Sequence, residues 1–289
     1  MDRRSISLSG LADYYPRRCR WQALLTAWSS GGRFRLAMAL MLGISLLGSL
    51  PAMAKTPGEV GSIAAEGFDH YTLALTWHPG FCATRHDPPR ECREASLRRG
   101  SETGFVLHGL WPSLPHRLDQ RGVERQRWRR QGCFIERERP AGGFCGHPTL
   151  GLNEGLDAQL DVVMPGRASC LGRYQYAKHA ACLRLSAEDL FGASVALVEA
   201  VNASVFTDFV VTQRGGEVRR NDLISAFESA FGEGRGRALR LECGGGGNRL
   251  LTEVRIGIDA QRLTDFPAPE SLVRLGLGNC PARVKIAAF

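Results

Sequence analysis

The stretch DHYTLALTW (Asp69–Trp77) alternates polar and apolar side chains and is rich in residues that favour β-strands. LLTEVRIGID (Leu250–Asp259), near the other end of the chain, alternates in the same way. Strands near both ends with helices between them predict an α+β fold, in which a central antiparallel sheet is flanked by helices. Shorter strands are expected at residues 104–107 and 239–243, with an edge strand at 284–286.

Between these strands, several stretches are predicted to be helices, of which residues 152–164 have an amphipathic pattern. Ser186 and Asn221 are the expected N-caps of two of them. The polar residues 85–100 predict a loop. The glycine run 244–247 predicts a turn, because it lacks the Lys-Ser/Thr and the helix of a phosphate-binding loop. The expected helices are residues 123–130, 152–164, 173–183, 190–201 and 222–231.

The composition is that of a packed soluble protein. Hydrophobic residues make up 44% of the 289 residues and charged residues 23%, which excludes a disordered chain, a polytopic membrane protein and a collagen-like fibre. The formal net charge is +8, but the first 54 residues hold seven arginines and two acidic residues. The rest of the chain is therefore mildly basic, which suits a polyanionic partner.

The N-terminal region has the pattern of a secretory signal peptide. A basic cluster around Arg33 precedes the apolar run LAMALMLGISLLGSL (Leu36–Leu50), and an Ala-x-Ala sequence ends at Ala54. The apolar run is shorter than the ~20 residues of a transmembrane helix. We therefore expect residues 1–54 to be a signal peptide with a long n-region, cleaved after Ala54, and residues 55–289 to be a single periplasmic or secreted domain. An uncleaved signal anchor is the alternative.

Eight cysteines follow the expected cleavage site, and an even number in an exported chain predicts four disulfides. The alternative is a zinc site, because His179 and Cys182 have the spacing of metal ligands. The chain contains no Cys-x-x-Cys pair, however, and structural zinc sites usually contain one. We therefore expect no metal. The eight cysteines are Cys82, Cys92, Cys133, Cys145, Cys170, Cys182, Cys243 and Cys280.

His108 stands out by its sequence context. It follows the apolar strand 104–107 and precedes Gly109-Leu-Trp111-Pro. A histidine at the end of a strand beside a glycine is held rigidly next to open space, and the aromatic residue that follows offers a stacking face. The same pattern is also common for a histidine with a purely structural role.

A second polar cluster is expected on the helix 173–183. Gln175, Lys178 and His179 fall at i, i+3 and i+4, and therefore on one face. A cation beside an imidazole, with an amide one turn away, suits the binding of an anion. The alternative is a solvated helix face that carries these residues without a function.

Two imidazoles and a lysine are sufficient for the cleavage of RNA without a metal. One imidazole removes the proton of the 2′-hydroxyl group, and the other protonates the departing 5′-oxygen, while the lysine stabilises the charge that develops on the phosphate. The ordinary histidine pKa of about 6.5 allows one imidazole to be neutral and its partner charged. An aromatic side chain such as Trp111 adds base stacking with little sequence preference.

At these residues the chain resembles the ribonuclease T2 family, and within it the bacterial periplasmic ribonuclease I type. The resemblance extends over residues 68–286. LECGGG, LTEVRIGI and Asn279-Cys280 are similar to the C-terminal strands of the family. The first strand and the two catalytic segments of the family are similar to LALTWHPGFC (Leu73–Cys82), FVLHGLWP (Phe105–Pro112) and YQYAKHAAC (Tyr174–Cys182).

The resemblance implies an α+β endoribonuclease that cleaves single-stranded RNA through a 2′,3′-cyclic phosphate, with little sequence preference and no cofactor. By position it implies His179 as general base, His108 as general acid, Lys178 as the phosphate-stabilising cation and Trp111 as a base-stacking residue, although the sequence does not settle which histidine is acid and which is base. We expect a monomer that stays off the membrane after signal cleavage. The resemblance also implies the disulfide Cys243–Cys280 and one between Cys182 and a cysteine near Cys133.

Three positions depart from the family pattern. Gln175 stands in place of a glutamate, Ala180 in place of a glycine, and Tyr174 in place of a histidine, although tyrosine is common in the bacterial branch and can still donate to a phosphate oxygen. A carboxylate at position 175 would hold up the pKa of nearby histidine and lysine side chains. Glutamine keeps the hydrogen bonding but loses the charge. We therefore predict that Gln175 weakens catalysis and shifts its pH optimum without abolishing activity.

The alternative function is a catalytically silent relative that binds RNA or another partner, with Gln175 marking the decay of its site. Both histidines are retained, which favours the enzyme. The arginines between Arg117 and Arg139 are candidates for contacts with phosphates beyond the scissile one; the alternative for them is an ordinary solvated face.

Overall fold

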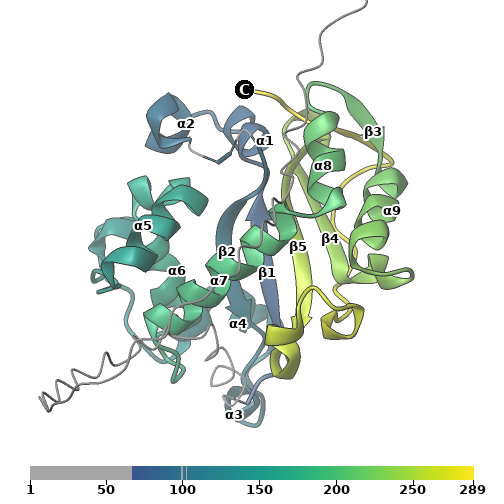
Figure 1. Cartoon of the computed structure of the whole chain (residues 1–289). Coiled ribbons are helices and arrows are strands. Elements are labelled where there is room, and N and C mark those ends of the chain that lie inside the picture. Colours follow the sequence, from purple (N-terminus) through teal and green to yellow (C-terminus); the bar gives the residue numbers. More distant parts are fainter. Residues whose placement is uncertain (1–66, 99, 102) are drawn as a thin grey trace, which may run out of the picture. The chain divides into compact units, whose positions relative to one another are not determined.

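The protein is described here from a computed structural model, in which residues 67–98, 100–101 and 103–289 are placed (Figure 1). This part of the chain has the α+β fold that the sequence predicts, with six strands in one sheet. The expected signal peptide, residues 1–54, lies outside the described residues and stays a prediction.

The two alternating stretches of the sequence, β1 and β5, pair antiparallel along their length. β2 flanks β1, and β4 pairs with β5, both antiparallel. The sheet order is β2-β1-β5-β6-β3, with β4 branching from β5. Within the described ranges, the only parallel pairing is the short contact of β5 with β6. The strands are β1 (His70–Thr76), β2 (Val106–Pro112), β3 (Glu217–Arg219), β4 (Leu239–Gly244), β5 (Leu250–Asp259) and β6 (Arg283–Lys285).

Two strands differ from the sequence prediction. β6 is not an edge strand, because β3, which the sequence pattern did not reveal, pairs with its outer side. β2 does not end at Leu107 but continues through His108 to Pro112. In its pairing with β1, Gly109 lies opposite Ala74 and Leu107 opposite Leu75. His108 is therefore an extra residue in the strand, a β-bulge, which interrupts the alternation that the sequence analysis relied on.

The hydrophobic core lies between the sheet and three helices. α7 crosses the sheet over β1 and β2 (Figure 1) and buries Leu190, Phe191 and Val198. Ser186 caps α7 as predicted, since its hydroxyl group accepts a hydrogen bond from the backbone N–H of Asp189. α8, which was not expected, packs against α9. The capping prediction for α9 is wrong: the helix begins one residue before Asn221 and leaves no side-chain cap. These helices are α7 (Ala187–Asn202), α8 (Val205–Thr212) and α9 (Arg220–Phe231).

The remaining helices precede α7 in the chain. The loop expected at residues 85–100 contains the short helix α2, and α1 follows β1 without a sequence signal that we identified. The helix expected at 173–183 is α6, which ends earlier, at His179. These helices are α1 (His78–Ala83), α2 (Arg90–Arg93), α3 (His116–Asp119), α4 (Arg125–Gln131), α5 (Glu154–Val163) and α6 (Leu171–His179). In the described part of the chain, no single helix is long and apolar enough to cross a membrane. Only α7 and α8 taken together, with a bend between them, have the required length and composition.

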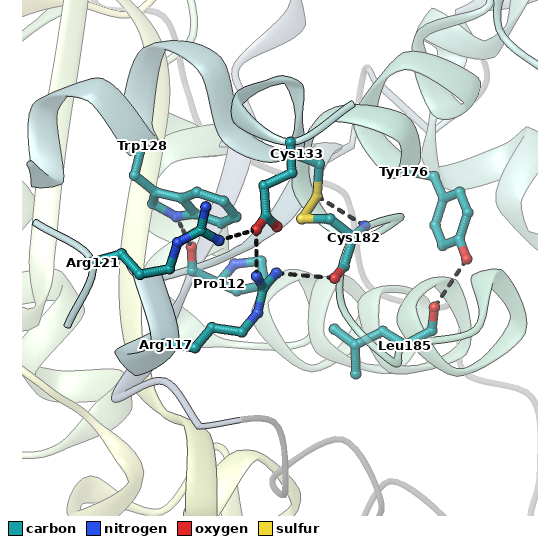
Figure 2. Close-up of a disulfide and its surroundings, with 9 residues drawn as sticks. Pro112, Arg117, Arg121, Trp128, Cys133, Tyr176, Cys182 and Leu185 are labelled. Carbon is teal, nitrogen blue, oxygen red and sulfur yellow. Dashed lines mark hydrogen bonds and ion pairs between the residues drawn. A yellow bond between two sulfur atoms is a disulfide. The ribbon is translucent and has the colours of Figure 1, made fainter. Parts of the chain in front are cut away.

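All eight cysteines after residue 54 form disulfides, which confirms the prediction of four bridges. Two pairings match those implied by the family resemblance, and the bridge to Cys182 is drawn in Figure 2. Because Cys182 is bonded to Cys133, it cannot bind zinc together with His179, and that alternative is wrong. The bridges are Cys82–Cys92, Cys133–Cys182, Cys145–Cys170 and Cys243–Cys280.

Candidate active site

The two faces of the sheet differ in chemistry. On β1, Leu73 and Leu75 are fully buried in the core, whereas Thr76 points to the opposite face. Residues that pair across neighbouring strands share a face, so Glu253 of β5, the partner of Thr76, lies on this second face. Arg255, two residues further along β5, lies there as well. This polar face forms the floor of the candidate active site.

The bulge in β2 places His108 on the polar face. In a regular strand, residues 108 and 110 would share one face, and His108 would point into the core beside Leu110. Because His108 is the extra residue, both Leu107 and Leu110 remain buried in the core, and His108 lies with Trp111 on the other side. The imidazole is therefore held by a sheet-forming segment but stays 31% exposed.

The helix α6 supplies the second group of predicted residues and lies against β2. Gln175 and His179 are on its buried side, and Lys178 is half-buried next to them. A cavity of about 490 Å³ is lined by all six residues that the sequence analysis singled out as catalytic or substrate-binding: His108, Trp111, Tyr174, Gln175, Lys178 and His179. A second cavity, of about 640 Å³, shares His108, Tyr174, Gln175 and Arg255 with the first.

His108 is paired with a buried carboxylate. Its Nδ1–H donates to Glu253 Oε2 at 2.5 Å, which leaves Nε2 available to a substrate. Burial alone raises the pKa of Glu253, but the charge and the hydrogen bond of His108, together with those of Arg255, outweigh it and hold this pKa below its ordinary range. Glu253 is therefore a carboxylate that places a negative charge beside the imidazole of His108.

His179 is in the opposite situation. It is 7% exposed, and no carboxylate pairs with it among the residues that the structure describes. Burial, together with the positive charges of Lys178 and His108, lowers the pKa of His179 well below 6.5. The same two causes act on Lys178, since burial and the nearby Arg139 lower its pKa. His179 is therefore a neutral imidazole at physiological pH.

Trp111 links the two histidines. Its ring centroid lies 5.1 Å from that of His108, in an edge-on arrangement, and 5.2 Å from that of His179, in a stacked arrangement. Its Nε1–H donates to Gln175 Oε1 at 2.7 Å. Gly109 makes this approach possible, because a Cβ atom at that position would meet the indole nitrogen at 2.5 Å and the amide oxygen of Gln175 at 2.7 Å. Trp111 thereby orients both imidazoles, while its role in base stacking stays a prediction.

Comparison with known proteins identifies the family of the chain. The family model described as "Ribonuclease T2 family" matches residues 68–267. The chain is 36% identical to Ribonuclease I of Escherichia coli (strain K12) over 256 residues, which cover 84% of this chain and 93% of that protein. The chain belongs to the ribonuclease T2 family. This ribonuclease T2 family member is accordingly an endoribonuclease.

Two further matches of this ribonuclease are more distant. It is 28% identical to a ribonuclease of Aeromonas hydrophila over 152 residues, which cover 53% of each chain. Among solved structures, the self-incompatibility associated SF11-RNase of Nicotiana alata is 18% identical, with a TM-score of 0.48, and the match covers 76% of this chain and all of that one.

The structure accounts for one of the departures of this ribonuclease from the family pattern. Ala180 is fully buried and has a φ of −131°, which lies outside the left-handed region that favours glycine. Gln175 is also buried, and its side-chain oxygen is engaged by Trp111. Tyr174 stacks on Phe144, with ring centroids 4.2 Å apart, at the border of the two cavities.

Glu253 and Arg255 are the residues that the sequence analysis missed. Their signal was present: the strand LLTEVRIGID carries two opposite charges at alternate positions between apolar residues. Charged residues on an interior strand are rare unless they are paired. Glu253 and Arg255 form an ion pair, and Arg255 also lies 3.4 Å from Glu242 on β4.

Proposed function

We propose that this endoribonuclease is exported and cleaves single-stranded RNA by transesterification, without a metal and with little sequence preference. In this reaction His179 removes the proton of a 2′-hydroxyl group, and the resulting oxygen attacks the adjacent phosphorus. His108 protonates the departing 5′-oxygen as its bond to phosphorus breaks. The products are a 2′,3′-cyclic phosphate and a new 5′-hydroxyl end.

The opposite surroundings of the two imidazoles in one cavity carry this proposal. A general base must start neutral, and burial beside a lysine makes His179 neutral. A general acid must hold a proton that it can release, and Glu253 accepts from the Nδ1–H of His108 and balances the charge of a second proton on Nε2. Two titratable groups in one cavity with opposite electrostatic surroundings are the usual sign of an acid–base pair.

The other residues have supporting roles. Lys178 makes no ion pair within the described part of the chain and faces the same cavity as both histidines, so it is suited to the charge that develops on the phosphate. Tyr174 lines the same cavity, and its hydroxyl group can donate a hydrogen bond to a phosphate oxygen. The two cavities meet at His108, which leaves room for nucleotides on both sides of the scissile bond, as an endonuclease requires.

Gln175 weakens catalysis in this proposal. Its amide oxygen accepts from Trp111 and keeps the indole in place, but it brings no negative charge to Lys178 or His179. A carboxylate at this position would stabilise the imidazolium that His179 becomes after it has accepted the proton. The enzyme therefore retains activity, but at a lower rate than with a glutamate.

The location and the assembly state belong to the same proposal. The N-terminal pattern and the four disulfides support an oxidising compartment outside the cytoplasm, periplasmic or secreted. We propose a monomer that is not held at the membrane once the signal peptide has been removed.

Digestion of bulk RNA in EDTA, with analysis of the products for 2′,3′-cyclic phosphates, tests the proposed function. We expect cleavage in EDTA, and a loss of about 10²–10⁴-fold in His108→Ala and His179→Ala. His86→Ala, which removes an exposed histidine outside both cavities, is the matched control and should cleave like the wild type. Binding of RNA without cleavage would support the silent relative instead, and activity lost in EDTA would refute the metal-independent mechanism.

A further inference from the structure

Among the arginines around α4, Arg117, Arg121 and Arg127 form a first group, whose side chains have partners within the protein. Arg117 and Arg121 both form ion pairs with Glu136, each at 2.7 Å, and Arg117 also donates to the carbonyl oxygen of Cys182 at 3.2 Å. Figure 2 shows both side chains turned toward the Cys133–Cys182 bridge. Arg127 donates to the side-chain oxygen of Gln131 at 3.0 Å. The guanidinium groups of this first group are occupied within the protein.

Arg125 and Arg129 form the second group. They are four residues apart on α4, so their side chains lie on the same face of the helix. Both line the cavity that contains His108, Lys178 and His179. Both side chains are exposed. Neither forms an ion pair or a hydrogen bond with any other described residue.

The remaining charges of the cavity leave this pair unopposed. Arg240 and Arg255 also line it, but they are paired with Glu242 and Glu253. Two acidic residues line the cavity, Asp69 and Asp119. Asp69 lies 2.8 Å from His116, and Asp119 forms no ion pair with either arginine of the second group.

The positive charges of Arg125 and Arg129 act on a residue in the wall of the cavity. On β1, the strand next to β2, burial is the main cause that lowers the pKa of His70, while Asp69 raises it and Arg129 and Arg125 lower it further. His70 lines the same cavity. Two guanidinium groups that are this close to the cavity wall, with no internal partner, are suited to an anion from outside. Guanidinium groups bind phosphate oxygens with paired, charge-assisted hydrogen bonds.

We propose that Arg125 and Arg129 form a second phosphate-binding subsite, which holds a phosphodiester of the RNA chain beyond the one that is cleaved. This inference rests on the proposed function, because it takes the scissile phosphate to lie between His108 and His179. Its consequence is a preference for chain length: a substrate with several phosphodiesters gains binding energy at α4 that a dinucleoside monophosphate, with a single phosphodiester, cannot gain.

The first measurement compares two double variants with the same change of charge. Arg125→Ala with Arg129→Ala removes the proposed subsite. Arg127→Ala with Arg130→Ala removes two arginines of the same helix that do not line the cavity. The quantity measured is the ratio of kcat/KM for a long single-stranded RNA to kcat/KM for a dinucleoside monophosphate. We expect at least about a tenfold fall of this ratio in the first variant and a change below about twofold in the control, as for ordinary surface charges.

The second measurement does not depend on catalysis. A single-stranded deoxyoligonucleotide lacks the 2′-hydroxyl group and cannot be cleaved by transesterification, so its affinity can be measured by fluorescence anisotropy at several salt concentrations. For Arg125→Ala with Arg129→Ala, we expect weaker binding. The slope of log affinity against log salt should also be smaller, by about 0.7 for each phosphate that the protein no longer neutralises.

The possible outcomes distinguish a failure of the proposed subsite from a failure of the proposed function. An unchanged ratio together with unchanged affinity in Arg125→Ala with Arg129→Ala overturns the subsite. Equal losses in the two double variants overturn it too, because they indicate a diffuse effect of charge. If the wild type does not cleave RNA, the proposed function fails, and the anisotropy measurement alone then decides whether the two arginines bind a nucleic acid phosphate. All four arginines are exposed, so thermal unfolding of both double variants should match that of the wild type.

Discussion

The segment that carries His108 and the segment that carries His179 deliver the same functional group to one cavity by different means. His108 lies on a strand, at a bulge, and is paired with a buried carboxylate. His179 lies at the end of a helix, is almost fully buried, and the charges that act on it are those of Lys178 and His108. The first histidine has a negative charge beside it, whereas burial and positive charges lower the pKa of the second. The difference between the two histidines is therefore set by the elements that surround them and not by the residue type.

The largest effect is expected from removing the disulfide that anchors the segment after α6. The Cys133–Cys182 bridge ties the chain after α6 to Cys133 and has a sequence separation of 49 residues. The Cys82–Cys92 bridge has a sequence separation of only 10 residues. Loop-closure entropy then predicts that Cys133→Ser with Cys182→Ser lowers the free energy of unfolding by about 4 kcal/mol, and Cys82→Ser with Cys92→Ser by about 3 kcal/mol. Urea unfolding measures both. We also expect a lower kcat in the first variant alone, because only that bridge adjoins His179; equal kcat values would contradict this.

The second largest effect is expected from breaking the pairing of His108 with Glu253, and it concerns kcat. Glu253→Gln keeps the size of the side chain but removes the negative charge that pairs with His108. A hydrogen bond to a charged group contributes about 1.5–3 kcal/mol, so we expect kcat to fall about 10- to 100-fold. KM should change little, because Glu253 lies behind His108 and acts as a positioning residue.

Glu242→Gln is the matched control for this change. Glu242 lies on the same face of the sheet and also pairs with Arg255, but it does not touch His108. Its kcat should stay near that of the wild type. Equal losses in the two variants would show that the charge network around Arg255 matters and that the contact with His108 does not.

The neutral state of His179 predicts the acidic limb of the pH profile. Because its pKa lies well below 6.5, the base stays unprotonated as the pH falls through 6.5, and kcat/KM should decline only at a lower pH. Gln175→Glu adds a negative charge nearby, which raises this pKa and moves the acidic limb upward by about 1–3 pH units, with a higher kcat at the optimum. Gln131→Glu adds the same charge on α4 and should leave the limb in place. A pH profile of Gln175→Glu identical to that of the wild type would refute the attenuation by Gln175.

The link between the two segments, Trp111, gives the smallest effect. Trp111→Phe keeps a ring between the imidazoles but removes the N–H that holds Gln175. Trp128→Phe removes a comparable bond, from Nε1 to the carbonyl oxygen of Pro112 at 3.0 Å. Each leaves a buried acceptor unpaired, which costs about 1–3 kcal/mol of stability. We expect kcat to fall, by up to about tenfold, only in Trp111→Phe; a fall in both variants would mean that loss of stability explains it.

Much of the site was predictable from short sequence motifs. Gln175, Lys178 and His179 share a helix face because of their spacing alone, and the structure bears out that geometry. Glu253 was missed because its importance depends on its contact with His108, which lies 145 residues away in the sequence. His108 was expected at the end of a strand, because a bulge depends on the register with a neighbouring strand, and the sequence of one strand does not contain that register.

Local periodicity, turn residues and the number of cysteines by themselves determined the α+β class, most of the helices and the presence of four disulfides, because these properties depend on neighbours in the chain. Only the tertiary structure decided which residues share the polar face of the sheet, which histidine meets a carboxylate and which arginines keep a free guanidinium group. The physical reason is that burial and Coulomb interactions act over a few ångströms in space, and the residues that meet at that distance come from strands and helices far apart in the sequence.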